Sequence, residues 1–333
     1  MHNVPFLLVV VIFMAVLFDF SNGWHDSANA IATVVSTRVL PPFVAVISAA
    51  ILNLIGAYLS TRVAKTIGSD IVEPQHLTQI AIFSAMLAAF IWSVITVLMG
   101  LPVSSSHSLI GGIIGAVIFS KDITYLKAEG IGKILISLAI SPFFGFLLGF
   151  LLMWLLMWVL RNLSASRVNL IFGKLQIFSS AYMALMHGTN DAQKTMGVIT
   201  MALINAGIIH KFEVPFWVVS ICALAMGLGT SFGGWKVIKT LGVNLMKLQP
   251  VNGFAAETAS ATVLLISATF GLPVSTTHAI TGSILGVGST KRFSAVRWGL
   301  GKKIVYAWII TFPFTILLAG GIHYTLSAIS RLL

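Results

Sequence analysis

Residues 100–107 read Gly-Leu-Pro-Val-Ser-Ser-Ser-His, and residues 271–278 read Gly-Leu-Pro-Val-Ser-Thr-Thr-His. The two stretches lie 171 residues apart (271 − 100 = 171), and the same gap-free offset matches Phe83, Gly111 and Gly115 to residues of the same type. Each stretch interrupts a long apolar run. Agreement over this length indicates an internal duplication, which predicts two structurally similar halves.

The composition places this duplicated chain in a membrane. Of the 333 residues, 57% are hydrophobic and 9% are charged, and the mean hydropathy is +0.99, whereas soluble domains carry about 25% charged residues. The apolar runs are continuous rather than alternating, which favours helices over a β-barrel. The sequence therefore predicts an all-α polytopic membrane protein with lipid around it. The net charge of +11 does not indicate nucleic-acid binding, since basic residues in short loops set membrane orientation.

The two interrupted runs predict membrane-embedded helical hairpins. No charged loop separates Ile80–Met99 from Ser108–Phe119, or the run Phe254–Phe270 from the helix after residue 278. A hairpin tip at membrane depth is tolerated where it lines a cavity within the protein. Duplicated halves in secondary transporters are commonly inverted, with the substrate site at their interface. We therefore expect two inverted repeats whose tips meet near mid-membrane.

The remaining segments set the expected domains and orientation. The first span is expected at Val4–Phe20, and Ala28–Val39 is expected to be broken or steeply tilted because it closes at a Pro-Pro pair. Basic residues follow the long apolar segment Ile134–Leu160 and also precede the last span. If both clusters face the cytoplasm, both termini are extracytoplasmic in the plasma membrane. The predicted units are an N-terminal repeat, a basic cytoplasmic linker and a C-terminal repeat, at residues 1–160, 161–174 and 175–333.

A second duplicated motif carries buried acids. Residues 22–29 read Asn-Gly-Trp-His-Asp-Ser-Ala-Asn, and residues 187–194 read His-Gly-Thr-Asn-Asp-Ala-Gln-Lys. Asp26 and Asp191 thus follow apolar runs. Ionisable groups inside a membrane are costly and are a functional-site hypothesis by default.

The hairpin tips are candidates for binding an anion. A proline at the start of a helix followed by hydroxyl residues offers free backbone N–H groups, the helix dipole and O–H donors to one ligand. The alternative is that these residues only cap the helices and pack closely. The hydroxyl candidates are Ser104, Ser105, Ser106, Ser275, Thr276 and Thr277.

Carboxylates beside an anion site favour an oxyanion that carries a proton, because a carboxylate only accepts hydrogen bonds. Phosphate at neutral pH has such a proton and sulfate does not. The acids also require a compensating cation, so H⁺ or Na⁺ coupling is expected. The predicted phosphate ligands add Asp26, Asp191, Asn190 and Lys194 to the hydroxyls. The predicted coupling-cation residues are Asp26, Asn29, Asp191, Asn22 and Glu257, with Na⁺ expected at Asp26, Asn29 and Asp191. Lys194 aligns with Asn29, so its ammonium could replace one coupling cation.

These motifs resemble the inorganic phosphate transporter (PiT) family, in its low-affinity bacterial form. The resemblance rests on residues 22–30, residues 187–194 and the two Leu-Pro-Val-Ser stretches. It implies cation-coupled symport of inorganic phosphate, carried by some relatives as a neutral metal–phosphate complex. The family has Asn where this chain has His25. The Gln193-Lys194 ending resembles bacterial members, many of which are linked to protons, and the coupling ion stays open between H⁺ and Na⁺.

The sequence also allows other interpretations. Transport of another oxyanion, sulfate or a dicarboxylate, is the main alternative, although the apolar segments lack the Arg that carboxylate sites favour. An intramembrane hydrolase would need a nucleophile elbow and would not explain a duplicated motif, so we expect no enzyme and no cofactor. A homodimer along residues 134–160 is compatible with the sequence, as is contact of this helix with lipid.

Overall fold

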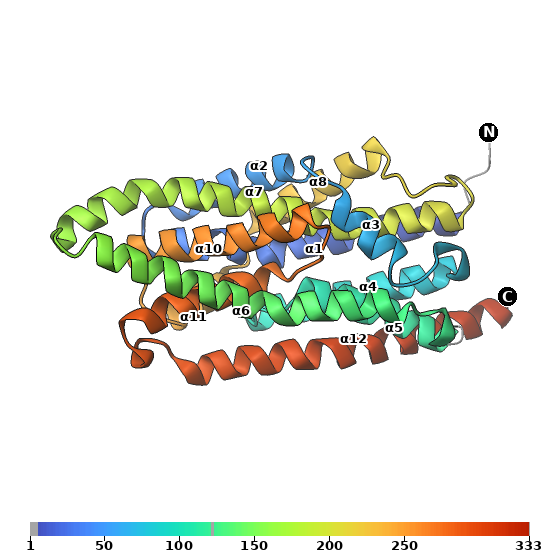
Figure 1. The fold of residues 1–333 in the computed structure, drawn as a ribbon. Helices are drawn as coiled ribbons and strands as arrows, with labels where there is room; N and C mark the ends of the chain where they lie inside the picture. Colours follow the sequence, from blue (N-terminus) through green and yellow to red (C-terminus); the bar gives the residue numbers. More distant parts are fainter. Residues whose placement is uncertain (1–5, 121–122, 333) are drawn as a thin grey trace.

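The computed structural model describes residues 6–120 and 123–332, which are helical and contain no strand. The order is α1 (Phe6–Ser36), α2 (Pro42–Gly56), α3 (Arg62–Ser69), α4 (Gln79–Met99), α5 (Ser105–Ser120), α6 (Ala128–Val159), α7 (Ala165–Asn205), α8 (Phe216–Phe232), α9 (Trp235–Lys239), α10 (Pro250–Thr269), α11 (Thr276–Lys291) and α12 (Trp298–Leu332). They form one elongated bundle (Figure 1). The start of the first expected span, Val4, lies outside the described residues.

Five helices of the described chain are long and apolar enough to cross a membrane: α1, α4, α6, α10 and α12. A sixth candidate combines α8 with Trp235–Asn244, bent by 63°. The predicted all-α polytopic membrane class is confirmed.

The sequence duplication reappears in the helices and their packing. Helix α5 starts at residue 105 and α11 at residue 276, which is the same 171-residue offset. Helix α6 packs along α11 as α12 packs along α5, and α1 packs along α8 as α7 packs along α2. Exchanging the two halves therefore maps each contact onto another. Corresponding helices run in opposite directions along the bundle, as α6 and α12 show in Figure 1.

Helices α1 and α7 differ from the expected segments because neither is broken at its acid motif. Helix α1 continues through Asp26 and ends at Ser36, so most of Ala28–Val39, predicted to be broken or steeply tilted, continues the first helix without a break. The chain leaves the helix where Arg38 adopts a φ of 62°, just before the prolines. Helix α7 runs for 41 residues, or about 60 Å at 1.5 Å per residue.

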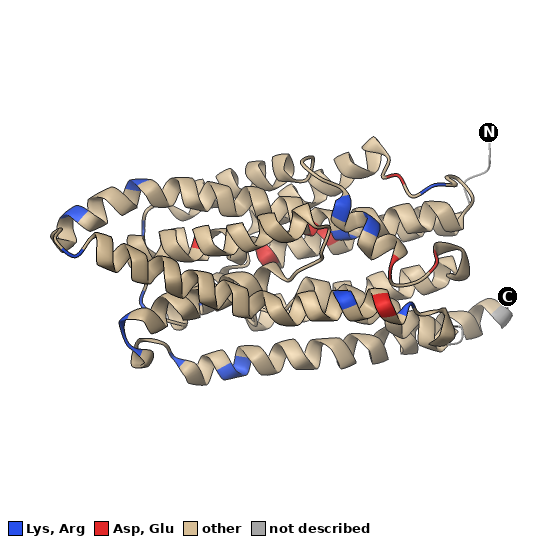
Figure 2. Ribbon diagram, in the orientation of Figure 1, with Lys and Arg blue, Asp and Glu red and all other residues tan. Residues whose placement is uncertain are grey.

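The stretch 161–174, predicted as a linker, mostly belongs to α7. The Ser164 side chain caps this helix by accepting from the Arg167 backbone N–H, so only residues 160–164 form the turn between α6 and α7. Figure 2 shows Lys and Arg gathered at the end of the bundle that holds this turn and the start of α12. The start of α1 and the end of α12 lie at the opposite end (Figure 1).

Candidate functional site at the hairpin tips

Two hairpins bring their tips together inside the bundle. Hairpin 1 consists of α4, residues 100–104 and α5, and hairpin 2 consists of α10, residues 270–275 and α11. Each tip turns at a glycine in the left-handed region, Gly100 at φ 71° and Gly271 at φ 68°, a conformation that glycine adopts without steric cost. The Ser106 hydroxyl donates to the Val274 carbonyl at 3.0 Å. The expected meeting of the tips is confirmed.

The predicted hydroxyls divide into two groups. Ser104 and Ser275 are N-caps, each accepting from the backbone N–H three residues later at 3.2 Å, and Ser106 links the tips. The contacts of these three residues are those that capping and packing would give, and their role as phosphate ligands stays a prediction. Ser105, Thr276 and Thr277 instead contact the acid motifs.

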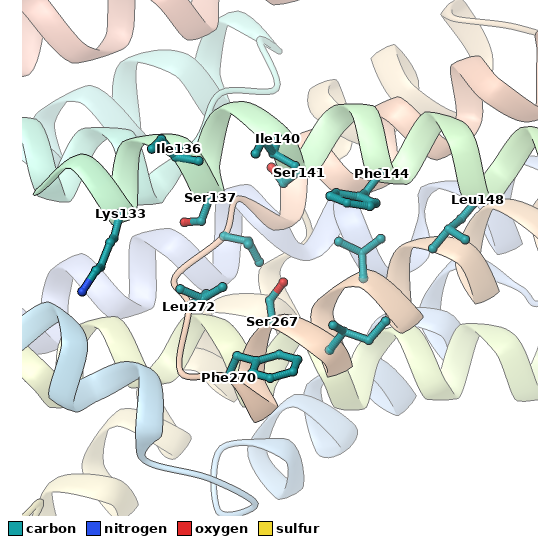
Figure 3. Close-up of a pocket in the computed structure, with 13 residues that line it drawn as sticks. Lys133, Ile136, Ser137, Ile140, Ser141, Phe144, Leu148, Ser267, Phe270 and Leu272 are labelled. Atoms are coloured by element: carbon teal, nitrogen blue, oxygen red, sulfur yellow. The ribbon is translucent and has the colours of Figure 1, made fainter. Parts of the chain in front are cut away.

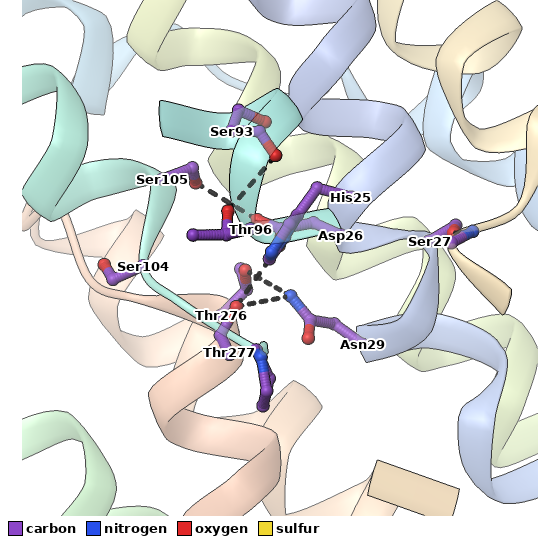
Figure 4. A network of polar contacts seen from close by, with 12 residues as sticks. His25, Asp26, Ser27, Asn29, Ser93, Thr96, Ser104, Ser105, Thr276 and Thr277 are labelled. Carbon is purple, nitrogen blue, oxygen red and sulfur yellow. Dashed lines mark hydrogen bonds and ion pairs between the residues drawn. The ribbon is translucent and has the colours of Figure 1, made fainter. Parts of the chain in front are cut away.

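Asp26 binds both hairpins (Figure 4). It accepts from Ser105 at 3.1 Å and from Thr277 at 3.3 Å. Its Oδ1 lies 2.5 Å from Nδ1 of His25, whose Nε2 lies 3.0 Å from the Leu101 carbonyl oxygen. Because that carbonyl only accepts, Nε2 donates to it, and one proton lies in the bond between Nδ1 and the carboxyl group. His25 therefore joins the acid to the tip of hairpin 1.

Asp191 has a different environment that includes a built-in cation. The Lys194 Nζ lies 2.8 Å from Oδ1 of Asp191 and donates to Ser105 at 3.0 Å. Thr276 donates to Oδ2 at 3.2 Å, and Nε2 of His187 lies 3.5 Å from the same atom. These side chains are buried. Lys194 thus links the acid of the second half to hairpin 1.

The three predicted asparagines have different surroundings. Asn29 donates to Thr276 at 3.1 Å and to Thr277 at 3.0 Å, and Asn190 donates to the Leu264 carbonyl at 3.0 Å. Within the described chain, the buried side chain of Asn22 makes no hydrogen bond, and neither do the side-chain oxygens of Asn29 and Asn190. Since an unsatisfied buried polar group costs about 1–3 kcal/mol, these atoms are suited to bind a ligand.

Glu257 belongs to a separate buried cluster. It accepts from Thr33 at 2.5 Å and from Gln176 at 3.0 Å, and it also binds the Ser179 hydroxyl. These partners lie on α1 and α7, about two or more helical turns along the sequence from the acids of the central site. The sequence did not indicate these partners, because they come together only when the two helices pack.

The central acids can hold a cation. Single ligand atoms of Asp26, His187 and Asp191 all lie within 4.8 Å of one another. His187 was not among the predicted site residues, although its position four residues before Asp191 puts both on one helix face. That spacing is the sequence signal that could have found it.

The arrangement agrees with similarities to known proteins. The sequence profile of the Phosphate transporter family matches residues 22–167 and 160–319. The chain belongs to this family. A probable low-affinity inorganic phosphate transporter of Bacillus subtilis is 45% identical over 97% of this chain and 98% of its own length. Its counterpart in Rhizobium meliloti is 44% identical over 94% of this chain and 95% of its own.

A solved structure described as the sodium-dependent phosphate transporter has a TM-score of 0.88 and 25% identity. The match covers 97% of this chain and 99% of that one. The family consists of transporters rather than enzymes. Together with the membrane-spanning helices of the fold, this makes the chain a multi-pass membrane protein of a phosphate transporter family.

Proposed function

We propose that the protein imports inorganic phosphate by cation-coupled symport, and that phosphate binds between the two hairpin tips. The observation that carries the proposal is the convergence of Ser105, Thr276 and Thr277 on Asp26 and Asp191, next to the buried ammonium of Lys194. When phosphate binds, each hydroxyl can turn its single O–H from a carboxylate to a phosphate oxygen, and the ammonium can pair with the charge of phosphate.

The same carboxylates support selectivity for phosphate over sulfate. A carboxylate accepts but does not donate, so it can bind the P–OH proton of phosphate. Sulfate at neutral pH carries no proton, so its oxygens would face the buried carboxylates of Asp26 and Asp191 without a hydrogen bond between them. A site that accepts a hydrogen bond from its ligand discriminates strongly against an analogue that lacks this donor.

The cation role follows from the charges. Asp26, His187 and Asp191 are close enough to bind Na⁺ or the metal of a metal–phosphate complex, and the solved relative is described as sodium-dependent. The proton shared by His25 and Asp26 supports H⁺ as the alternative. Lys194 supplies a fixed positive charge at Asp191, so only the first half requires a mobile cation at its acid. Glu257 is a further candidate for carrying H⁺ or Na⁺.

The proposal includes an inverted arrangement of the halves in the plasma membrane. It is supported by the opposite directions of α6 and α12 (Figure 1) and by the basic residues gathered at one end of the bundle (Figure 2). Placing that end in the cytoplasm puts the start of α1 and the end of α12 outside. Units of residues 1–160 and 175–333 then form the two repeats.

Competition for phosphate uptake tests the proposed site. Proteoliposomes should take up labelled phosphate, with inhibition by arsenate but not by sulfate. Ser105→Ala and Thr276→Ala should raise KM, while Ser220→Ala serves as a control because this exposed hydroxyl bonds only to its own helix. Equal inhibition by sulfate, or unchanged KM in both site variants, would contradict the proposal.

A further inference from the structure

A cavity of about 420 Å³ lies between α6 and α10, beside the tip of hairpin 2 (Figure 3). Its lining is mainly apolar and includes Phe144, Leu148 and Val263 on the walls and Leu272 and Val274 from the tip. It is nearly three times larger than the cavity of about 150 Å³ that can hold benzene. This volume is sufficient for an extended apolar group.

The corresponding positions beside hairpin 1 carry larger side chains at three places. Subtracting 171 from Val263 gives Trp92, and adding 171 to Ser137 and Ser141 gives Trp308 and Phe312. The Trp308 indole donates to the carbonyl of Pro102 in tip 1 at 2.8 Å, as the Ser137 hydroxyl donates to the carbonyl of Pro273 in tip 2 at 2.6 Å. The hydrogen bond is therefore preserved, while three residues that line or border the cavity beside tip 2 have aromatic counterparts beside hairpin 1.

The cavity opens toward the surrounding membrane. On its rim, Ile136 is 60% exposed, Phe144 is 52% exposed and Phe270 is 75% exposed. Large apolar side chains on the surface of a membrane-spanning bundle face lipid, so hydrocarbon can enter from the side. An acyl chain can supply apolar contacts at positions where the corresponding residues beside hairpin 1 are aromatic.

One end of the cavity carries basic side chains, one of them paired with an acid. Lys133 lines that end (Figure 3), with its side chain 66% exposed. Its Nζ lies 2.7 Å from Glu129. Arg62 contacts the same end of hairpin 2, donating to the Thr269 carbonyl at 2.7 Å. An ammonium and a guanidinium next to an apolar groove match a phosphate attached to a hydrocarbon chain.

We propose that this cavity binds one acyl chain of a phospholipid, whose phosphate contacts Lys133 and Arg62. The chain supports the tip of hairpin 2 as Trp308 and Phe312 of α12 support hairpin 1. Because the chain can leave and the aromatic rings cannot, hairpin 2 is the more mobile tip. The consequence for transport rests on the function proposed above, whereas the binding itself does not.

Photo-crosslinking tests the binding directly. The full-length protein is reconstituted with phosphatidylglycerol that carries a diazirine in one acyl chain, and labelled peptides are mapped by mass spectrometry. We expect labelling of residues 136–148 and 263–270 above the level at Ile309, a lipid-facing residue of α12 that is 62% exposed. Equal labelling at all lipid-facing positions would overturn the proposal. Crosslinks between two protein copies at these residues would overturn it as well, since they would make a second subunit the occupant.

Tryptophan substitutions that fill the cavity test the site further, with a tryptophan on the lipid-facing surface as their control. Ser137→Trp introduces the residue type of its counterpart Trp308, with an N–H for the Pro273 carbonyl, and Val263→Trp repeats the test at a second position. Both should reduce labelling to the level at Ile309, while Ile309→Trp should leave it unchanged. Undiminished labelling in a folded filled variant would overturn the site. Reduced phosphate transport by the filled variants would support the mobility of hairpin 2, and unchanged transport would refute that consequence alone.

Discussion

Replacing Lys194 by Asn tests whether a fixed ammonium takes the place of a coupling cation. The change gives the second half the residue that the first half carries as Asn29. It removes the buried positive charge 2.8 Å from Asp191. The carboxylate should then recruit a cation from solution, and Na⁺ should stabilise the variant more than the wild-type protein.

The distance sets the size of the effect. At 2.8 Å and an effective dielectric constant of about 20, the attraction between the two charges is about 6 kcal/mol before desolvation. Removing one partner of a buried ion pair costs about 3–5 kcal/mol. Na⁺ at 100 times its Kd would restore about 2.7 kcal/mol. If the added Na⁺ is transported, each 100 mV of membrane potential adds about 2.3 kcal/mol to phosphate accumulation.

Thermal unfolding of the purified protein in NaCl and in choline chloride provides the assay. It requires no transport, and Lys65→Asn is the control because that lysine is exposed on α3. In proteoliposomes, the Na⁺ to phosphate ratio should rise in Lys194→Asn. Equal stabilisation of the variant and the wild-type protein by Na⁺, with an unchanged ratio of Na⁺ to phosphate, would show that Lys194 does not take the place of a coupling cation.

Three further predictions concern folding and coupling. Gly188→Ala should prevent correct folding, because the new Cβ would lie 2.1 Å from a backbone oxygen of α2. Gly173→Ala is the control, since its Cβ would have nothing within 4 Å. Size-exclusion profiles distinguish the two variants, and a monodisperse Gly188→Ala protein would be contrary evidence. Glu257→Gln should keep the fold but reduce cation-driven uptake, and uptake equal to wild type would remove Glu257 from the coupling route. Trp308→Phe should lower stability by about 1 kcal/mol through loss of one hydrogen bond, with an unchanged unfolding midpoint as the contradicting result.

The parts of the fold that repeat in sequence could be predicted, because the repeat fixes corresponding positions independently of packing. The 171-residue offset predicted two hairpins, and α5 and α11 start at this separation. Proline followed by hydroxyls predicted the helix starts after the tips. The continuity of α1 and α7 could not be predicted in this way. It depends on partners distant in sequence, such as Ser105, which bonds Asp26 from 79 residues away.

The residues of the candidate site could be predicted in part, but their contacts could not. Residue type and membrane depth identified Asp26, Asp191 and Lys194, since buried charge is conspicuous in an apolar sequence. The distinction between capping and site hydroxyls depends on which way each side chain points in the first helical turn, and the periodicity does not specify this. The partners of Glu257 were not predictable, because Thr33, Gln176 and Ser179 gather through the register of antiparallel helices.

The most direct test of the central claim is uptake of labelled phosphate into proteoliposomes with Na⁺ and pH gradients imposed separately. We expect either the Na⁺ gradient or the pH gradient to drive uptake. Uptake should be lost in Asp26→Asn, because the carboxyl group of Asp26 binds both hairpins. The gradient that drives uptake identifies the coupling cation. Absence of phosphate uptake under both gradients, or full activity in Asp26→Asn, would contradict the account.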